Sequence, residues 1–232
     1  MIRVFKLVVV SLMSVLVVAA CGGAKSTPAP AAAPAEQSVV QAKAGERVFV
    51  IDSTQTEARY EVKESFFGEA FARIQKKDGD IIAIGRTKGV SGSFAFKIDG
   101  TSVQLGDSRF RVDVKALTSD DNRRDEQIRK RYLESNNFPI AEFVAKEIQD
   151  FPDGFSEGQP VTFKLAGDLT IHGVTNPATF DVTATLNGDT LSGTATTLVF
   201  AKDFGFDAPN VANILKVEDG FTIVIDFVAK EK

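Results

Sequence analysis

The sequence is poor in the residues that cross-link chains or hold metals. Its 232 residues include one cysteine, one histidine and no tryptophan. A lone cysteine cannot form a disulfide within the chain, so the folded part must be held together by its hydrophobic core. The lone histidine, His172, has no second imidazole with which to build a metal site, and a Ser-His-Asp triad would have to use it. A single histidine in a turn is usually a solvated residue.

The motifs of several enzyme classes are also absent. No Gly-x-Ser-x-Gly element, glycine-rich phosphate loop or paired-cysteine metal motif occurs in the chain. Gly89-Val90-Ser91-Gly92 comes nearest to the first of these, but it lacks the final glycine. We therefore predict a protein that is not an enzyme and has no cofactor or metal, with an enzyme acting on lipid substrates as an alternative.

The charge balance excludes one class of partner. The chain has 27 basic and 31 acidic residues, and its formal net charge is −4. Nucleic-acid binding requires clustered lysine and arginine residues to neutralise phosphates. No such run of basic residues is present, so we predict no nucleic-acid partner.

The longest apolar run is too short for a transmembrane helix. Residues 7–18 follow Arg3 and Lys6, and a membrane span needs about twenty apolar residues. The order of basic, apolar and small residues is typical of a secretory signal peptide. Val18-Ala19-Ala20 then leads into Cys21, as in a bacterial lipobox. We predict cleavage before Cys21 and acylation of that residue, with palmitate among the acyl groups; the alternative is a plain secretory signal followed by a free thiol.

The predicted organisation is a signal peptide over residues 1–20, the lipidated cysteine and a linker over 21–44, and one folded domain over 45–232. Glycine, proline and alanine dominate the linker, and such a composition favours a flexible tether. Two or more acyl chains anchor a protein stably. The expected location is therefore the extracytoplasmic face of the cell envelope. The residue after Cys21 is Gly22 and not aspartate, and this resembles an outer-membrane sorting signal. If the host has a single membrane, the outer face of its plasma membrane fits equally.

Apolar and polar residues alternate through most of the domain. This period of two is typical of half-buried antiparallel strands and appears at residues 94–98, 110–116, 161–171, 180–186 and 221–227. Turn residues separate these runs, and they include Asp99-Gly100, Asp153-Gly154, Gly173 with Pro177, Asn187-Gly188-Asp189 and Asp219-Gly220. The pattern predicts an all-β antiparallel barrel or sandwich. One charged segment, residues 121–134, lacks the alternation and predicts a short helix that caps the barrel.

Four motifs in a fixed order resemble those of a known family. They are the opening strand Phe49-Val50-Ile51-Asp52, the element Asn122-Arg123-Arg124-Asp125-Glu126 with Phe138-Pro139, the run Gly167-Asp168-Leu169-Thr170-Ile171-His172-Gly173-Val174-Thr175-Asn176-Pro177, and Lys202-Asp203-Phe204-Gly205-Phe206. Together they resemble the YceI-like proteins, the bacterial polyisoprenoid-binding family. The resemblance implies an antiparallel lipocalin-like β-barrel of about eight strands with a short helix. It also implies an elongated apolar cavity for a polyprenyl phosphate, a quinone-type lipid or another isoprenoid.

The chain departs from the family pattern at three histidine positions. Gln55, Glu64 and Gln127 stand where the family usually has histidine. If those histidines meet a ligand headgroup, the headgroup preference of this chain differs. The segment over residues 67–86 also looks longer than usual, and we expect a flap over one end of the barrel.

The candidate ligand contacts are aromatic residues on the predicted strands. The chain has 19 phenylalanines, which suit either a packed core or a tunnel for a hydrocarbon tail. The predicted cavity-wall residues are Phe94, Phe96, Phe110, Phe163 and Phe180. Arg124 and Gln55 are candidate headgroup contacts, because arginine suits phosphate oxygens. The alternative for Arg124 and its charged neighbours is an ion-pair network on a solvated helix.

The resulting hypothesis is a membrane-anchored lipoprotein that stores, transports or shields a long isoprenoid or similar apolar lipid. It predicts that an aspartate at Phe94 or Phe163 abolishes lipid uptake. The alternative is a non-catalytic envelope interaction module whose barrel is filled with side chains. A fold alone does not distinguish the two.

Overall fold

The protein is described by a computed structural model that covers residues 40–67, 80–100, 102–211 and 214–232. The predicted signal peptide, Cys21 and most of the linker lie outside these ranges. Nearly all regular structure is strand, as the sequence predicts. The strands are β1 (Arg47–Ile51), β2 (Glu57–Phe66), β3 (Asp80–Thr87), β4 (Val90–Asp99), β5 (Ser102–Leu105), β6 (Ser108–Asp113), β7 (Ile140–Gln149), β8 (Val161–Ile171), β9 (Val174–Asn187), β10 (Thr190–Phe200), β11 (Asn210–Val211) and β12 (Leu215–Glu231). The helices are α2 (Asn122–Lys130) and the short 3₁₀ helix η1 (Ala201–Phe204).

Eight of these strands close into an antiparallel barrel, which confirms the predicted fold. Their order is β1-β4-β6-β7-β8-β9-β10-β12, and β12 pairs back with β1. The 17-residue strand β12 is long enough to pair with two different strands, one after the other, along the same edge. Its residues 229–231 pair with β1, and its residues 215–226 pair with β2.

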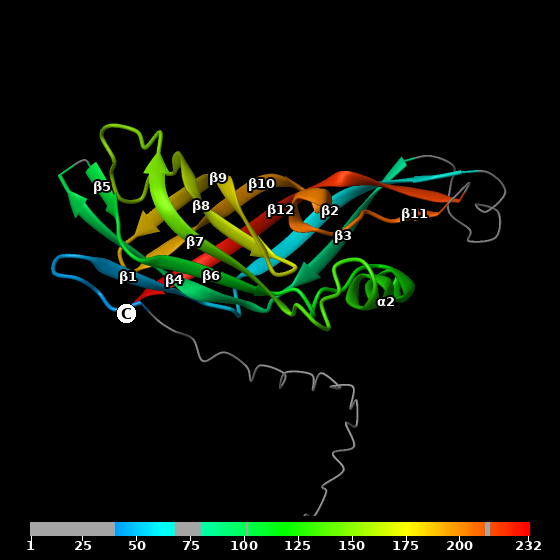
Figure 1. Ribbon diagram of the computed structural model, residues 1–232. Helices are drawn as coiled ribbons and strands as arrows, with labels where there is room; N and C mark the ends of the chain where they lie inside the picture. The colour runs from blue at the N-terminus through cyan, green and yellow to red at the C-terminus, as the bar shows by residue number, and fades with distance from the viewer. Residues whose placement is uncertain (1–39, 68–79, 101, 212–213) are drawn as a thin grey trace, which may run out of the picture. The chain divides into compact units, whose positions relative to one another are not determined.

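The β2–β3 hairpin therefore extends the barrel at one end. The last part of β3 is tied to the chain that follows β6, because Arg86 and Thr118 exchange two backbone hydrogen bonds of 2.8 and 3.0 Å. Figure 1 shows α2 beside this β2–β3 part, at the opposite end of the barrel from β5. Strand β3 begins at Asp80, so residues 80–86 of the predicted flap form a strand; residues 68–79 lie outside the described ranges.

The turn between β8 and β9 consists of two residues only. His172 and Gly173 both have positive φ, at 53° and 75°, as a two-residue hairpin turn requires. The prediction that Pro177 belongs to this turn is wrong, because Pro177 lies in β9 opposite Asp168. Strand β10 pairs only with residues 181–187 of β9, so Pro177 has one paired neighbour, and proline is tolerated at such edge positions.

Two other local predictions are also corrected. Asp219-Gly220 does not separate strands but forms an irregularity inside β12, where the register against β2 shifts between Val217 and Phe221. Strand β6 ends at Asp113 instead of continuing to residue 116. The Asp113 carboxylate accepts hydrogen bonds from the backbone of Lys115 and Ala116, which turns the chain away from the sheet. The Asn187-Gly188 signal does mark the β9–β10 hairpin.

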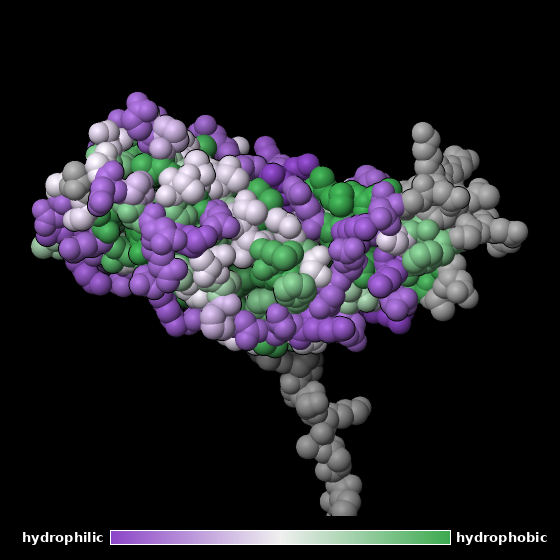
Figure 2. All heavy atoms as spheres, turned by 90° about the horizontal axis from the view of Figure 1, so that it is seen from above, coloured by the Kyte–Doolittle hydropathy of each residue, from purple (hydrophilic) through white to green (hydrophobic). Residues whose placement is uncertain are grey.

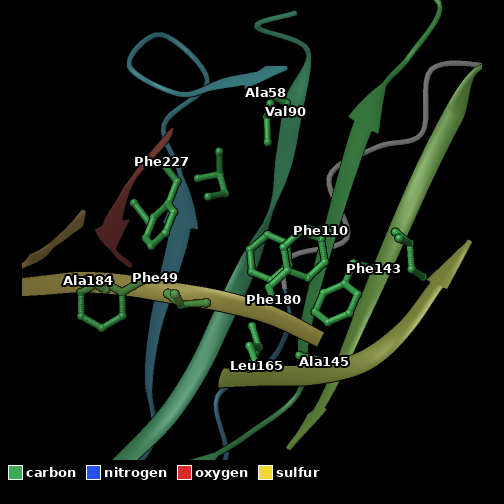
Figure 3. Close-up of a cluster of buried hydrophobic side chains, with 14 of the residues drawn as sticks. Phe49, Ala58, Val90, Phe110, Phe143, Ala145, Leu165, Phe180, Ala184 and Phe227 are labelled. Carbon is green, nitrogen blue, oxygen red and sulfur yellow. The ribbon is translucent and has the colours of Figure 1, made fainter. Parts of the chain in front are cut away.

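One end of the barrel is filled by phenylalanine side chains. Phe94 lies 4.0 Å from Phe110 and 5.6 Å from Phe227 between ring centroids, and Phe96 stacks on Phe49 at 5.1 Å. Figure 3 shows Phe110, Phe143 and Phe180 gathered together, with Phe49 and Phe227 further along the same interior. Burial of these rings, together with the aliphatic residues of the same core, stabilises the barrel.

The predicted helix forms over nine residues of the charged segment. Asp121 is its N-cap and accepts a hydrogen bond from the backbone of Arg123. Within the described ranges, no helix has both the length and the apolar character needed to cross a membrane. Hydrophilic residues predominate on the face of the domain drawn in Figure 2, as expected when the polar residues of each strand point outward.

Candidate functional site

The part of the barrel beyond the phenylalanine cluster is hollow. A cavity of about 490 Å³ lies between β2, β6, β7, β8, β9, β12 and one face of α2. Its walls are mainly apolar. The inward face of β2 contributes every second residue to the wall, namely Ala58, Tyr60, Val62, Glu64 and Phe66. A volume of this size falls within the range of about 300–1,000 Å³ that is typical of small-molecule sites.

Two of the five predicted wall residues line this cavity. Phe110 and Phe180 are in its wall. Phe94 and Phe96 instead fill the packed end of the barrel, and Phe163 contacts Phe151 at 5.5 Å outside the cavity. Period-two alternation indicates which residues point inward, but it does not indicate how far along the barrel each residue lies.

Several wall residues were not predicted from the sequence. They lie mainly on β2 and β12, and they include Tyr60, Val62, Phe221, Ile223 and Ile225. The alternation at residues 221–227 predicts a strand, and the same period of two could have placed Ile223 and Ile225 on its inward face. The alternation of β2 is weaker, because its inward face carries a tyrosine and a glutamate.

A buried ion pair forms the main polar feature of the cavity wall. The Arg124 guanidinium donates from Nε and Nη2 to the two carboxylate oxygens of Glu64, both at 2.9 Å. The side chains of Arg124 and Glu64 are only 12% and 5% exposed. Burial lowers the pKa of Arg124, but hydrogen bonds to Glu64 and Asp120 outweigh this effect and hold that pKa above its ordinary value. Arg124 therefore keeps its positive charge within an apolar wall.

The other predicted headgroup contact lies elsewhere. Gln55 is exposed in the turn before β2, where its side-chain amide donates to Asp52 at 2.6 Å. It is not among the residues of the cavity wall. Gln127, by contrast, does line the cavity from α2. The helical period places it on the same face as Arg124.

The charged helix segment forms an ion-pair network, but its centre is buried instead of solvated. Asp125 is 3% exposed and accepts hydrogen bonds from the backbone and hydroxyl of Ser119 at 3.0 and 2.6 Å. Arg124 also donates to that hydroxyl at 3.0 Å. Arg123 is exposed at the border of the cavity, and Glu126 is exposed on α2, where it pairs with Lys130. The alternative prediction of an ion-pair network on a solvated helix is therefore right about the ion pairs but wrong about solvation, because Arg124 and Asp125 are buried.

Tyr60 presents a hydroxyl without a partner in the cavity wall. Its oxygen is fully buried and has no hydrogen bond, and the same holds for Oδ1 of Asp219. Burial raises the pKa of the Tyr60 hydroxyl well above its ordinary value, so this group stays protonated and can donate. Buried polar atoms without partners are rare and call for a physical explanation.

Gly85 makes room for the Tyr60 ring on the neighbouring strand. A methyl group at this position would lie 2.2 Å from Cε1 of Tyr60. Gly85→Ala is therefore expected to lower the free energy of unfolding by about 1 kcal/mol, at the lower end for overpacking because the ring can swing into the cavity. Urea unfolding in the wild-type and Tyr60→Leu backgrounds checks this result. An equal loss in both backgrounds would contradict the assigned contact.

His172 is not the solvated turn residue that the sequence predicts. Its side chain is 14% exposed, and its Nε2 lies 3.1 Å from a carboxylate oxygen of Glu134. The ring packs at 4.4 Å against Phe138 and at 5.6 Å against Phe206. In the described part of the chain, no group of histidine, cysteine or acidic residues is arranged to hold a metal ion. His172 fixes the β8–β9 turn against the loop after α2.

The helix cap should make the stability of the domain fall as the pH is lowered from 4 toward 2. The hydrogen bond from Arg123 lowers the pKa of Asp121 to about 2, against the opposing effect of burial. Because the pKa of an aspartate is about 3.9 in an unfolded chain, the cap stabilises the fold fully above pH 4 and loses its effect as the pH falls toward 2. Asp121→Ala is expected to cost about 1 kcal/mol at neutral pH.

Thermal unfolding between pH 7 and pH 2 measures this effect. The difference between wild type and Asp121→Ala should shrink below pH 4. A constant difference across the range would argue against the ionised cap. Asp153→Ala, in an exposed loop, serves as the control.

Comparison with known families and structures gives a consistent result. Residues 49–229 match the family model of the YceI-like domain. A UPF0312 protein of Vibrio vulnificus is 29% identical over 132 residues, which cover 56% of this chain and 59% of the relative. A UPF0312 protein of Pseudomonas putida is 35% identical over 117 residues, which cover 46% of this chain and 56% of the relative. The chain thus spans less than two thirds of the length of these relatives.

Two solved structures share the architecture. BcnA of Burkholderia cenocepacia is 19% identical with a TM-score of 0.57, over 78% of this chain and 99% of BcnA. A polyisoprenoid binding domain from Saccharophagus degradans, implicated in plant cell wall breakdown, is 14% identical with a TM-score of 0.58, over 79% of this chain and 98% of that domain. At these identities the likeness shows a common fold alone.

Proposed function

The chain belongs to the YceI-like family, and from that membership and its hollow barrel we propose that it binds a long isoprenoid or similar apolar lipid. The observation that carries the proposal is the apolar cavity of about 490 Å³. A hydrocarbon tail has no polar groups to satisfy, so a wall of aliphatic and phenyl side chains suits it. The polyisoprenoid-binding neighbour with the same fold supports this choice of ligand class.

The protein would store, carry or shield its lipid without changing it chemically. A barrel filled throughout with side chains would have favoured the alternative of an interaction module. The interior is instead filled at the end around Phe49 and Phe94 and hollow at the end around Val62 and Ile223. A hollow apolar interior costs the fold packing energy, which a bound lipid would restore.

Extraction of the purified protein tests the proposal. The full chain, isolated from the membranes of its own host, is extracted with organic solvent, and the extract is analysed by mass spectrometry. We expect an isoprenoid in an amount comparable to that of the protein. A protein that contains no such lipid and also takes up none on addition would disprove the proposal.

We also propose that lipidated Cys21 anchors the domain on the extracytoplasmic face of a membrane. The support is the sequence Val18-Ala19-Ala20-Cys21 after a short apolar run. Cells fed radiolabelled palmitate should incorporate label into the wild type and into Ser26→Ala, a control in the same linker. Cys21→Ser should incorporate none. Labelling of the Cys21→Ser protein would exclude this anchor.

A further inference from the structure

We propose that the cavity selects isoprenoids with an uncharged, hydroxyl-bearing headgroup and rejects the phosphate esters of the same tail. This inference rests on the proposed lipid-binding function and specifies its ligand. It follows from the ion pairs in the cavity wall, because a cation that already binds a carboxylate has few donors left for an anionic ligand.

The most buried cation of the wall is already occupied. Arg124 makes four hydrogen bonds to oxygen atoms of the protein: two to Glu64, one to Ser119 and one to Asp120. A guanidinium has five N–H donors, so a single donor is left. A phosphate could gain a bidentate contact with Arg124 only by displacing one of these acceptors. Displacement of Glu64 would leave a buried charge without a partner, and displacement of Asp120 would break the more exposed of the two ion pairs of Arg124.

The other arginines of the wall are engaged or exposed. Arg59 binds Glu61 at 2.8 Å and also contacts Asp226, and Arg123 binds Asp121 at 3.2 Å. Arg131, at the end of α2, is exposed and lies 5.7 Å over the Tyr132 ring. Its charge is screened by water at the edge of the site. Arg131 is therefore the residue through which a phosphate would most easily gain affinity, and the experiment includes it.

An unpaired carboxylate oxygen adds repulsion. Oδ1 of Asp219 is buried in the wall without a partner. The strand register places Asp219 between the pairs Val217–Glu64 and Phe221–Val62, so this oxygen lies on the stretch of β12 that borders Glu64. A phosphate brought here would meet a second carboxylate of the wall, which belongs to a half-buried residue. A hydroxyl group could instead donate a hydrogen bond to Asp219.

The wall also offers a donor that suits a neutral oxygen. The Tyr60 hydroxyl is buried in the wall without a partner, and its raised pKa keeps it protonated. Its oxygen lies beside Gly85 and has no accessible surface, so the ring must turn into the cavity before the hydroxyl can donate to the oxygen of an alcohol or phenol. One wall therefore carries a free neutral donor and a free acceptor, while its buried cation is already paired. That combination favours an isoprenoid alcohol or phenol over an isoprenoid phosphate.

Three ligands with one tail test the preference. Geranylgeraniol, geranylgeranyl phosphate and geranylgeranyl diphosphate are titrated into the delipidated full-length protein, and bound lipid is measured by native mass spectrometry. We expect the alcohol to bind at least about tenfold more tightly than either ester. Equal or tighter binding of an ester would overturn the inference and leave the lipid-binding function intact. Binding of none of the three would overturn both.

Charge-neutralising variants test the cause. Glu64→Gln frees Arg124 and should raise the affinity for geranylgeranyl phosphate by about tenfold or more while leaving that for geranylgeraniol nearly unchanged. Asp219→Asn removes a carboxylate whose buried oxygen has no ion-pair partner. It should also reduce the preference for geranylgeraniol over geranylgeranyl phosphate, and it provides the test if Glu64→Gln folds poorly. Glu126→Gln, an exposed ion-paired residue of α2, should shift nothing.

Two outcomes would defeat this cause. If neither Glu64→Gln nor Asp219→Asn reduces the ratio of the affinities for geranylgeraniol and geranylgeranyl phosphate, the charges of the wall do not determine the preference for the alcohol. If the wild type binds the phosphate and Arg131→Gln loses that binding, the exposed arginine outweighs the buried charges and the inference fails.

Discussion

Replacement of Val62 by tryptophan is expected to lower isoprenoid affinity by about thirty- to a hundredfold while the barrel stays folded. Val62 lies on the inward face of β2 and borders the cavity. An indole in that space displaces several methylene groups of the ligand, and each buried methylene contributes about 0.8 kcal/mol. The fold should tolerate the larger side chain because it enters an existing cavity instead of a packed core.

The neighbouring residue provides a matched control. Lys63 lies on the outward face of the same strand and forms an ion pair with Asp80 at 2.7 Å, with its side chain 38% exposed. Lys63→Trp adds the same indole at the next position and loses two exposed ion pairs, with Asp80 and with Glu218 at 3.6 Å, each of which contributes at most about 1 kcal/mol. Its lipid affinity should equal that of the wild type. Native mass spectrometry measures loading, and equal loading of the two variants would show that the lipid does not occupy this cavity.

The second large effect concerns the buried ion pair. Glu64→Leu is expected to lower the free energy of unfolding by about 3 kcal/mol, because it leaves the Arg124 charge in an apolar wall. The loss should be at the low end for a broken buried pair, since Ser119 and Asp120 still contact Arg124. Urea unfolding of the purified variants gives the free energies.

The double variant Glu64→Leu/Arg124→Leu separates charge from packing. Replacement of a whole buried pair by apolar residues is often neutral or stabilising. The double variant should therefore regain most of the stability that Glu64→Leu loses. Glu126→Leu, on the exposed side of α2, should change stability little. If the two substitutions of the buried pair simply add, the ion pair is not coupled as its geometry indicates.

These two residues also illustrate what sequence patterns can and cannot provide. Arg124 was a candidate contact because its residue type suits phosphate, and the structure does place it in the cavity wall. Its partner Glu64 is 60 positions away in the chain. No local pattern pairs residues at that distance; the pairing of β12 with β2 and the position of α2 bring them together.

The sequence by itself determined most of the local structure. Period-two alternation identified strands such as β8 and β12, the charged segment identified α2, and the Asn187-Gly188 signal located a hairpin, because each of these depends on neighbours a few residues apart. Motif resemblance added the barrel closure. The tertiary structure alone decided which inward residues fill the barrel and which line the cavity, since depth along a barrel is set by strand register between distant segments. For the same reason Phe94 became core while Val62 became wall, and Asp219-Gly220 became an irregularity of β12 instead of a turn.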